Sequence, residues 1–505
     1  MSQTTRFRAG GGTAPTNRSL VLAVCCVAQL MVVLDVSVVM VALPQIRHAL
    51  GMSVAGQQWV VNAYTLTFAG FLMLGGRAAD IWGRKRVFMA GLGAFTFFSL
   101  MGGLAVNADW LVAARALQGL GGAVLAPATL SLLTTSFPRP DERRRALGAW
   151  SATAASGAAV GVLLGGVLTQ ALDWRWVLFV NVPIGAALLA LTAAGVKDEA
   201  TSAPRPSLDV PGAVTVTGGL ALLVYGIVST SSRSWGSPVT VASLAGGALL
   251  LGAFTLVEQR WAVQPLVPLS VFRRRSLSAA NGIAVTIGAA LFGLYFFLTL
   301  YLQQVNHYSA LEGGLAYLPA GLATLAAAVT GSRLVARIGP RRQLVLGPVL
   351  AAGALAWLSA LAPGMGYWGH VFAPLVLAGA GFGLSFVPMT MAATAGMPPQ
   401  QAGLAAGLIN TTRQVGGALG LAVMSTLAAG VADSHLGHAV RAASALTDGY
   451  DRAFLVSAIV LAAGAAAALF LPKAARAVPG PTPQSGRTAT VAVVGEDLGL
   501  TVEPA

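Results

Sequence analysis

The sequence predicts an all-α, polytopic membrane protein with fourteen transmembrane helices. Of its 505 residues, 56% are hydrophobic and only 10% are charged, and the mean hydropathy is positive. Long apolar runs recur along the chain, and short charged segments separate them. No soluble domain of this size is so apolar, and the net charge of +14 fits cytoplasmic loops better than nucleic-acid binding.

The apolar runs divide the chain into five parts. We expect a cytoplasmic tail at 1–19, a six-helix bundle at 20–200, two linker helices and an inner loop at 201–275, a second six-helix bundle at 276–472, and a disordered cytoplasmic tail at 473–505. The fourteen predicted helices are 20–44, 57–76, 87–106, 110–136, 146–169, 176–196, 211–230, 238–257, 278–303, 312–334, 343–362, 368–392, 402–430 and 452–472.

Lysine and arginine are distributed unevenly between the two predicted sides. The tails and the loops on their side hold 24 of them, whereas the opposite side holds five, including Arg441 and Arg452. The positive-inside rule therefore predicts that both termini are cytoplasmic.

A short hairpin after the second apolar run occurs twice. Gly75, Arg77 and Gly83 of the first copy correspond to residues 331, 333 and 339 of the second, 256 residues later. We expect the glycines to let two helices approach and turn, with Asp80 at the N-terminal end of the next helix. A simple positive-inside anchor is the alternative, but it would need neither the glycines nor the acid.

The first copy resembles the loop signature of the major facilitator superfamily in Gly76, Asp80, Gly83, Arg84 and Lys85. The resemblance implies a major-facilitator-type fold and a gating role for this loop. Ile81 stands where family members usually carry a basic residue, and the second copy has Ala336 in place of the acid. Fourteen spans are typical of the drug:proton antiporter branch that includes the EmrB and QacA proteins.

Two charged residues fall within apolar spans. Asp35 lies in the middle of the first helix, and Arg115 lies in the fourth, three residues before Gln118. Such groups face a cavity, pair with each other or carry protons. Both segments resemble signatures of the branch, which implies a proton-coupling role for Asp35 and Arg115. A static ion pair between them is the alternative.

The fifth helix carries Gly157, Gly161, Gly165 and Gly166. Glycines four apart line one helix face and permit close packing, which is the structural alternative. The run resembles the antiporter motif of exporters, although Val162 replaces its proline.

Polar residues also interrupt the thirteenth predicted helix, at Asn410, Arg413 and Gln414. Together with Gln118 they are our candidates for the substrate cavity, and helix packing is the equal alternative. His435 and His438 are three residues apart, but loop exposure is the default and we predict no metal site.

These observations favour a proton-coupled secondary transporter that exports amphipathic or lipophilic drugs by alternating access. A dedicated exporter of one self-made metabolite is the alternative, followed by an importer. No lysine follows a glycine as a phosphate-binding loop requires, and the scattered His and Cys residues disfavour an enzyme. We expect no cofactor beyond the proton gradient. The expected partners are the lipid bilayer of a bacterial plasma membrane, protons and a small lipophilic substrate, and no envelope partner protein is indicated.

Overall fold

The computed structural model describes residues 18–196, 208–230, 233–262, 265–395, 397, 402–436 and 442–471. In these residues every regular element is helical. The predicted tail at 473–505 and most of the predicted tail at 1–19 lie outside the described residues. The first helix begins at Arg18.

The helices of the first half and the linker follow the predicted order. They are α1 (Arg18–Ala49), α2 (Val54–Trp82), α3 (Arg84–Gly103), α4 (Ala108–Ser136), α5 (Pro140–Ala171), α6 (Trp176–Phe179), α7 (Asn181–Gly195), α8 (Val210–Ser229) and α9 (Pro238–Leu256), with the π-helical turn η1 (Val257–Trp261) after α9.

The second half repeats this order with more irregular turns. Its elements are η2 (Leu269–Arg273), α10 (Arg275–Leu300), η3 (Tyr301–Val305), α11 (Ala310–Ala316), α12 (Leu318–Ile338), α13 (Pro340–Leu358), η4 (Tyr367–Val371), α14 (Phe372–Thr394), α15 (Ala402–Leu436) and α16 (Ala442–Ala468).

Twelve candidate membrane spans, not the fourteen predicted, are found among the described residues. The predicted spans 146–169 and 343–362 are helices, α5 and α13, but neither is long and apolar enough over its described residues. In α5 the apolar stretch with described side chains is Ala159–Ala171, which is shorter than a span. In α13 the 19 residues include Arg341, Arg342 and Gln343, which lower the hydropathy of any long window.

The last helix begins ten residues earlier than predicted. The expected span was 452–472, whereas α16 starts at Ala442 and contains Asp451 and Arg452. Because α16 extends past the apolar run, Arg452 is a helical residue and not part of a connecting loop.

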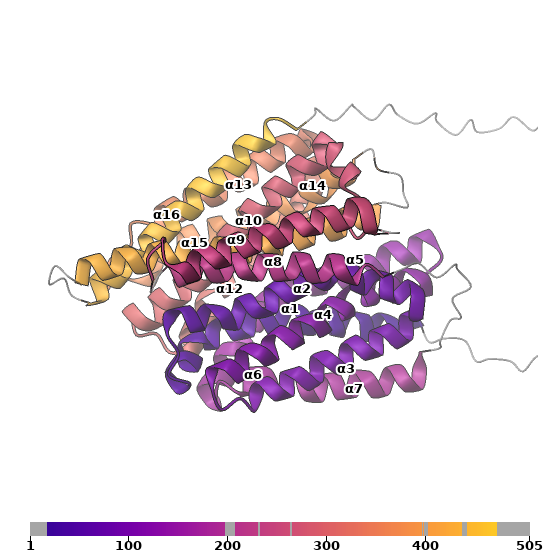
Figure 1. Cartoon of the computed structure of the whole chain (residues 1–505), viewed down its shortest axis with the longest axis horizontal. Helices are drawn as coiled ribbons and strands as arrows, with labels where there is room; N and C mark the ends of the chain where they lie inside the picture. Colours follow the sequence, from indigo (N-terminus) through magenta and orange to yellow (C-terminus); the bar gives the residue numbers. More distant parts are fainter. Residues whose placement is uncertain are drawn as a thin grey trace, which may run out of the picture. The chain divides into compact units, whose positions relative to one another are not determined.

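Each half of the chain forms its own set of helix contacts. In the first half α1 packs against α5, while α2 and α3 pack against α4. In the second half α10 packs against α15 and α16, while α12 and α13 pack against α14. Figure 1 shows these helices running side by side. The proposed boundaries of the two bundles stay a prediction.

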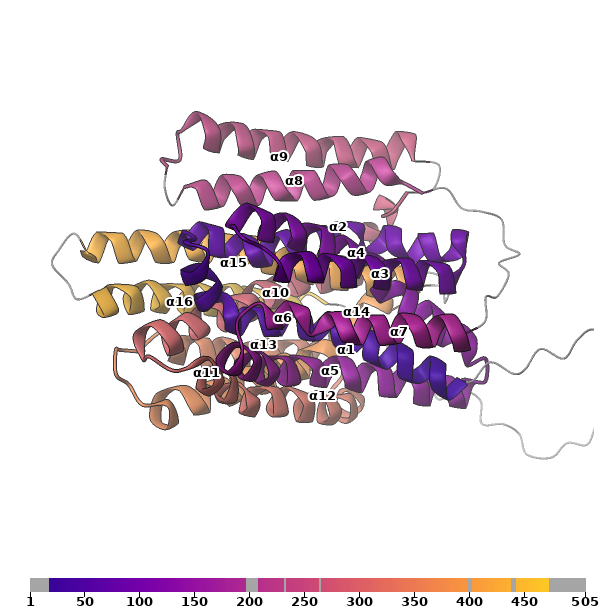
Figure 2. The ribbon, with the colours of Figure 1, turned by 90° about the horizontal axis from the view of Figure 1, so that it is seen from below.

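The linker helices α8 and α9 form an antiparallel pair beside both halves. They pack against each other, and α8 also contacts α2 and α15. Figure 2 shows α8 between α9 and the remaining helices. Through α8 the pair touches one helix from each half.

The hairpin between α2 and α3 is tighter than the sequence suggests. Helix α2 continues through Gly76 and Asp80 to Trp82, and Gly83 alone makes the turn, with φ +93°. Asp80 therefore lies in the last turn of α2, exposed, and not at the N-terminus of α3 as predicted. A backbone with positive φ suits glycine, so a single residue reverses the chain.

The basic residues after this turn tie α3 to its neighbours. The Arg84 Nε atom donates to the Ser131 hydroxyl of α4 at 2.9 Å, and the Lys85 ammonium donates to the Ala193 carbonyl in the last turn of α7 at 3.2 Å. A cation near the carbonyl end of a helix is favoured by the helix dipole.

The second hairpin repeats the same geometry. Gly339 separates α12 from α13 with φ +81°, at the position that corresponds to Gly83. At Gly75 an added Cβ would lie 2.3 Å from the Ala123 carbonyl oxygen of α4, so this glycine permits the expected close approach. The repeated hairpins thus agree in conformation as well as in sequence.

Candidate functional site

Asp35 lies in the middle of α1 and is completely buried. Helix α1 packs against α4, α5 and α7, and these helices enclose the carboxylate. Burying an ionised carboxylate without partners would cost much free energy. The stability of the site therefore depends on the hydrogen-bond donors around Asp35.

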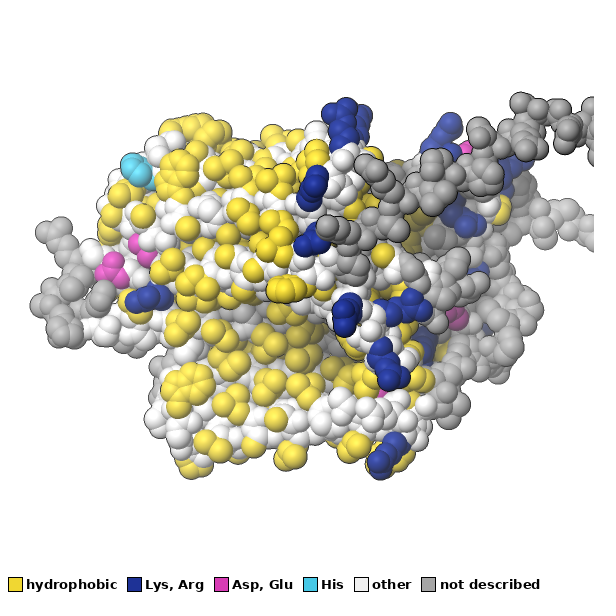
Figure 3. Space-filling model, turned by 90° about the horizontal axis from the view of Figure 1, so that it is seen from above, with side chains coloured by type: hydrophobic (Ala, Val, Ile, Leu, Met, Phe, Trp, Pro, Cys, Tyr) yellow, Lys and Arg dark blue, Asp and Glu magenta, His cyan; other side chains and the backbone are white. Residues whose placement is uncertain are grey.

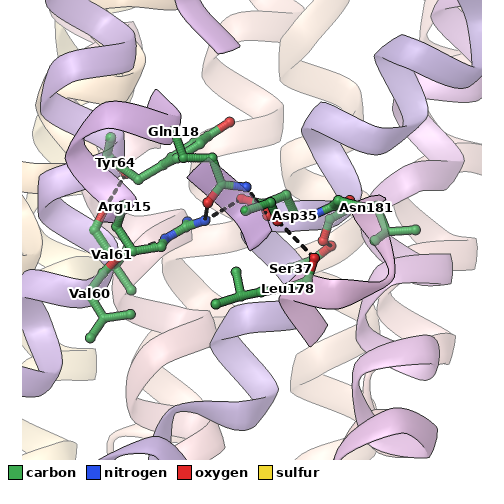
Figure 4. A network of polar contacts seen from close by, with 12 residues as sticks. Asp35, Ser37, Val60, Val61, Tyr64, Arg115, Gln118, Leu178 and Asn181 are labelled. Atoms are coloured by element: carbon green, nitrogen blue, oxygen red, sulfur yellow. Dashed lines mark hydrogen bonds and ion pairs between the residues drawn. The ribbon is translucent and has the colours of Figure 1, made fainter. Parts of the chain in front are cut away.

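Arg115 and Gln118 of α4 supply two of these donors, as Figure 4 shows. The Arg115 Nη1 atom lies 2.5 Å from Asp35 Oδ2, and Gln118 Nε2 donates to Asp35 Oδ1 at 2.8 Å. Arg115 Nη1 also donates to Gln118 Oε1 at 2.7 Å. The predicted pairing of Asp35 with Arg115 is therefore present, and the i, i+3 spacing places Gln118 on the same helix face.

Asn181, the first residue of α7, is the third donor to Asp35. Its Nδ2 atom lies 2.9 Å from Asp35 Oδ1 and 3.0 Å from the Ser99 hydroxyl oxygen. The Ser99 hydroxyl in turn donates to the Leu178 carbonyl at 2.8 Å. Asn181 is not among the site residues predicted from the sequence, although it falls in the predicted helix 176–196. An asparagine in an apolar span is the signal that would have found it.

Helix α2 completes the surroundings of Arg115. The Nε atom of Arg115 donates to the Val60 carbonyl at 3.3 Å, and its guanidinium carbon lies 4.3 Å from the centre of the Tyr64 ring. A guanidinium over an aromatic face gains cation–π stabilisation. The ion pair is thus held by α1, α2, α4 and α7 together, and a change in any of these helices reaches the carboxylate.

The glycines of α5 let this helix pack closely against α1. A Cβ at Gly161 would lie 2.0 Å from the Ser37 hydroxyl and 3.0 Å from the Leu34 carbonyl oxygen, and one at Gly165 would lie 2.9 Å from the Val38 carbonyl oxygen. A Cβ at Gly157 would lie 3.1 Å from the Val33 side chain, which is tighter than an ordinary contact. These glycines therefore line the face of α5 that packs against α1 beside Asp35, and their role as an antiporter motif stays a prediction.

Gly166 has a different neighbour, in the second half of the chain. A Cβ at this position would lie 2.7 Å from the Ala310 carbonyl oxygen and 3.0 Å from the Leu311 Cα of α11. In return, a Cβ at Gly314 of α11 would lie 2.7 Å from the Val162 carbonyl oxygen. The backbones of α5 and α11 therefore meet at two glycines.

The polar residues of α15 form a separate group. The Arg413 Nη2 atom donates to Asn410 Oδ1 at 2.8 Å, and the guanidinium carbon lies 5.3 Å from the Phe386 ring centre of α14. Asn410, Arg413 and Gln414 are partly exposed, whereas Gln118 is fully enclosed in the Asp35 network. A role for all four in substrate binding stays a prediction.

The structure gives no support to a metal centre in the part of the chain that it describes. Among those residues no three His, Cys, Asp or Glu side chains are grouped to hold a metal ion. The His438 residue and the His435 side chain lie outside the described part.

Replacement of Asn181 by Ala tests the third donor. A hydrogen bond to a charged group contributes about 1.5–3 kcal/mol, so we expect lower stability together with a loss of transport. The matched control is Asn281→Ala, because Asn281 is also buried but bonds to Thr412 in the second half. Thermal unfolding and transport by purified, reconstituted protein measure both effects. Equal transport by the two variants would contradict a role for Asn181 at Asp35.

A buried, charge-paired acid inside a body of apolar helices is typical of a multi-pass membrane protein with a functional site in its interior. Residues 25–421 match the Major Facilitator Superfamily, and the chain belongs to this family of transporters, which are not enzymes.

Two curated relatives align with nearly the whole chain. The "Cephamycin export protein CmcT" of Amycolatopsis lactamdurans is 43% identical over 475 residues, which cover 92% of this chain and 95% of the relative. The "Puromycin resistance protein pur8" of Streptomyces alboniger is 43% identical over 450 residues, which cover 88% of each.

A solved structure shares the fold. A bacterial homologue of the human lysosomal transporter Spinster, in an inward-facing and occupied conformation, matches with a TM-score of 0.66 and 17% identity. The match covers 91% of this chain and 97% of that chain. At this identity the likeness concerns the fold alone.

Proposed function

We propose that the chain is a proton-coupled exporter of amphipathic or lipophilic antibiotics that works by alternating access. The observation that carries the proposal is the enclosed Asp35, which accepts hydrogen bonds from Arg115, Gln118 and Asn181. A buried ion pair is weak evidence for stability, so a working role accounts better for its presence. The export and resistance proteins that resemble this chain over most of their length support the direction of transport.

Proton exchange at Asp35 is the proposed coupling step. When Asp35 is ionised, its oxygens accept hydrogen bonds from all three donors. Protonation removes the charge that holds Arg115, which frees α4 from α1 and favours the other conformation of the transporter. Since Asp35 is enclosed by both helices, release of the proton requires the contact to open.

The energy source is sufficient for export. One pH unit provides about 1.4 kcal/mol per proton, and 100 mV adds about 2.3 kcal/mol per charge moved. Together they sustain a substrate gradient of roughly a few hundredfold for one net proton.

We further propose that α5 and α13 cross the bilayer with the twelve candidate spans, which would place the chain in the fourteen-helix branch. Both helices pack among spans on both sides, α5 against α1 and α12, and α13 against α14 and α16. Their charged residues lie in the first turns, toward one end of each helix, and Gln343 of α13 is buried among other helices, where a polar side chain is tolerated.

The proposed location is a bacterial plasma membrane, with both termini cytoplasmic. In Figure 3 hydrophobic side chains cover most of the visible face, and Lys and Arg gather toward one end. This one-sided distribution supports a positive-inside orientation.

Everted membrane vesicles with an acidic lumen test this function. We expect a proton gradient to drive accumulation of substrate in the lumen, with release of luminal protons, and a protonophore to abolish both. The panel contains a cephamycin, puromycin, a lipophilic cation and a tetracycline. Uptake of several compounds indicates multidrug export, whereas uptake of one indicates a dedicated exporter. Accumulation that survives the protonophore would refute proton coupling.

A further inference from the structure

Two carboxyl groups meet at one end of the linker pair, far along the chain from Asp35. Asp209 precedes α8 as its N-cap, and Glu258 lies in η1 at the end of α9. The exposed fraction is 6% for Asp209 and 5% for Glu258. The helix pair therefore brings together two acids that are 49 residues apart and removes both from solvent.

Backbone N–H groups bind most of the carboxyl oxygens. Glu258 accepts hydrogen bonds from the Leu266 N–H at 3.2 Å and the Val267 N–H at 3.1 Å, one at each oxygen. Asp209 Oδ1 accepts from the Gly212 N–H at 2.8 Å. Asp209 Oδ2 is buried and has no hydrogen-bond donor among the described residues. A buried acceptor without a donor is unfavourable, so this atom points to an additional donor.

Charge is also unbalanced at this place. Asp209 stands at the start of α8 and Glu258 lies in η1, and these two elements contact each other. Arg77 of α2 acts on both acids and donates to the Pro265 carbonyl. One guanidinium faces two carboxyls, so with both acids ionised the group would carry a net negative charge away from solvent.

We propose that Asp209 and Glu258 share one proton and form a second proton-binding site, separate from Asp35. Two ionised carboxylates are acceptors only, whereas a carboxyl that keeps its proton donates to the other. The shared proton supplies the donor that Asp209 Oδ2 lacks and leaves one negative charge for Arg77. Two acids in such contact take up protons in two separate steps, because the first charge opposes the second.

The position of this site gives the proton a structural effect. The carboxyl pair joins the start of α8 to the end of α9, and Arg77 connects both to the α2 end that precedes the Gly83 turn. Loss of the proton places two negative charges side by side and weakens the joint between the start of α8 and the end of α9. The inference goes beyond the proposed transport activity and requires no substrate.

Infrared spectroscopy of the purified full-length protein in lipid nanodiscs tests the proposal. The measurement uses the Asp35→Asn background, so that Asp35 does not contribute, and follows the carbonyl stretch of protonated carboxyl groups as pH is raised. We expect a protonated carboxyl at neutral pH that disappears in Glu258→Gln and in Asp209→Asn. In each variant the remaining carboxyl ionises beside Arg77. Asparagine retains the capping function at position 209.

The matched control is Glu312→Gln. Glu312 also accepts a backbone hydrogen bond, from the Ser309 N–H, but it is exposed. This change is expected to leave the carbonyl band intact. The proposal is overturned if neither Glu258→Gln nor Asp209→Asn reduces the band, or if Glu312→Gln reduces it equally. Because no substrate is present, this outcome is independent of whether the vesicle experiment succeeds.

Discussion

Replacement of Asp35 by Asn is expected to reduce proton-coupled transport by about 100-fold or more, the scale typical for loss of an essential proton-transfer group. Asparagine has the same shape but cannot bind and release a proton. It also presents an NH₂ group to a site in which Arg115, Gln118 and Asn181 all donate. Luminal pH and substrate accumulation in everted vesicles measure the effect.

Lower stability has to be separated from lost coupling in this variant. Removal of one partner of a buried ion pair typically costs about 3–5 kcal/mol, because Arg115 is left charged and buried. The double variant Asp35→Asn with Arg115→Gln removes both charges, so we expect it to regain thermal stability but not transport. A double variant that regains both would show that the pair is structural.

Asp173→Asn is the matched control for the loss of one acid. Asp173 lies between α5 and α6, is about half exposed, and bonds to the Arg175 backbone N–H. We expect this variant to transport like the wild type. If Asp35→Asn instead behaves like Asp173→Asn, the proton must cross by another route.

The centre of the site could be predicted from the sequence because charge in an apolar span has few partners. Asp35 and Arg115 are the acidic and basic residues that fall inside the first six predicted spans. Each needs an opposite charge in the apolar interior, so the sequence predicts that they pair. The α5 glycines were predictable for a similar reason, since their spacing allows one close neighbour along one face.

Other parts depended on geometry that residue patterns do not encode. Asp80 was assigned to the wrong helix because the turn requires only Gly83, whose positive φ ends α2 at Trp82. Asn181 joins Asp35 because α7 packs beside α1; an asparagine in an apolar span marks the residue, but the sequence does not tell which helix it contacts. Asp209 and Glu258 come close because α8 and α9 pair. The residues between them carry no pattern that would predict this proximity.

Gly166→Ala is expected to reduce transport by roughly tenfold to a hundredfold with little loss of thermal stability. The added methyl would lie 2.7 Å from the Ala310 carbonyl oxygen, so the backbones of α5 and α11 could not meet as they do here. Overpacking of this kind costs about 1–3 kcal/mol, which shifts a two-state equilibrium by the same order. The added methyl destabilises only the conformation in which α5 packs against α11. The variant therefore favours the conformation in which these two helices separate.

The matched control for Gly166→Ala is Gly353→Ala in α13, where an added Cβ meets no atom within 4 Å. A conformational readout comes from Gln303→Cys in a background without Cys25 and Cys26. Gln303 of η3 lies beside α11 and α1, because a Cβ at Gly313 would lie 3.4 Å from its Nε2 atom, which is 2.9 Å from the Val41 carbonyl oxygen. We expect this cysteine to react faster with a maleimide when Gly166→Ala is added, and at an unchanged rate with Gly353→Ala. Unchanged reactivity together with wild-type transport would mean that α5 and α11 stay in contact throughout the cycle, and alternating access would then have to open elsewhere.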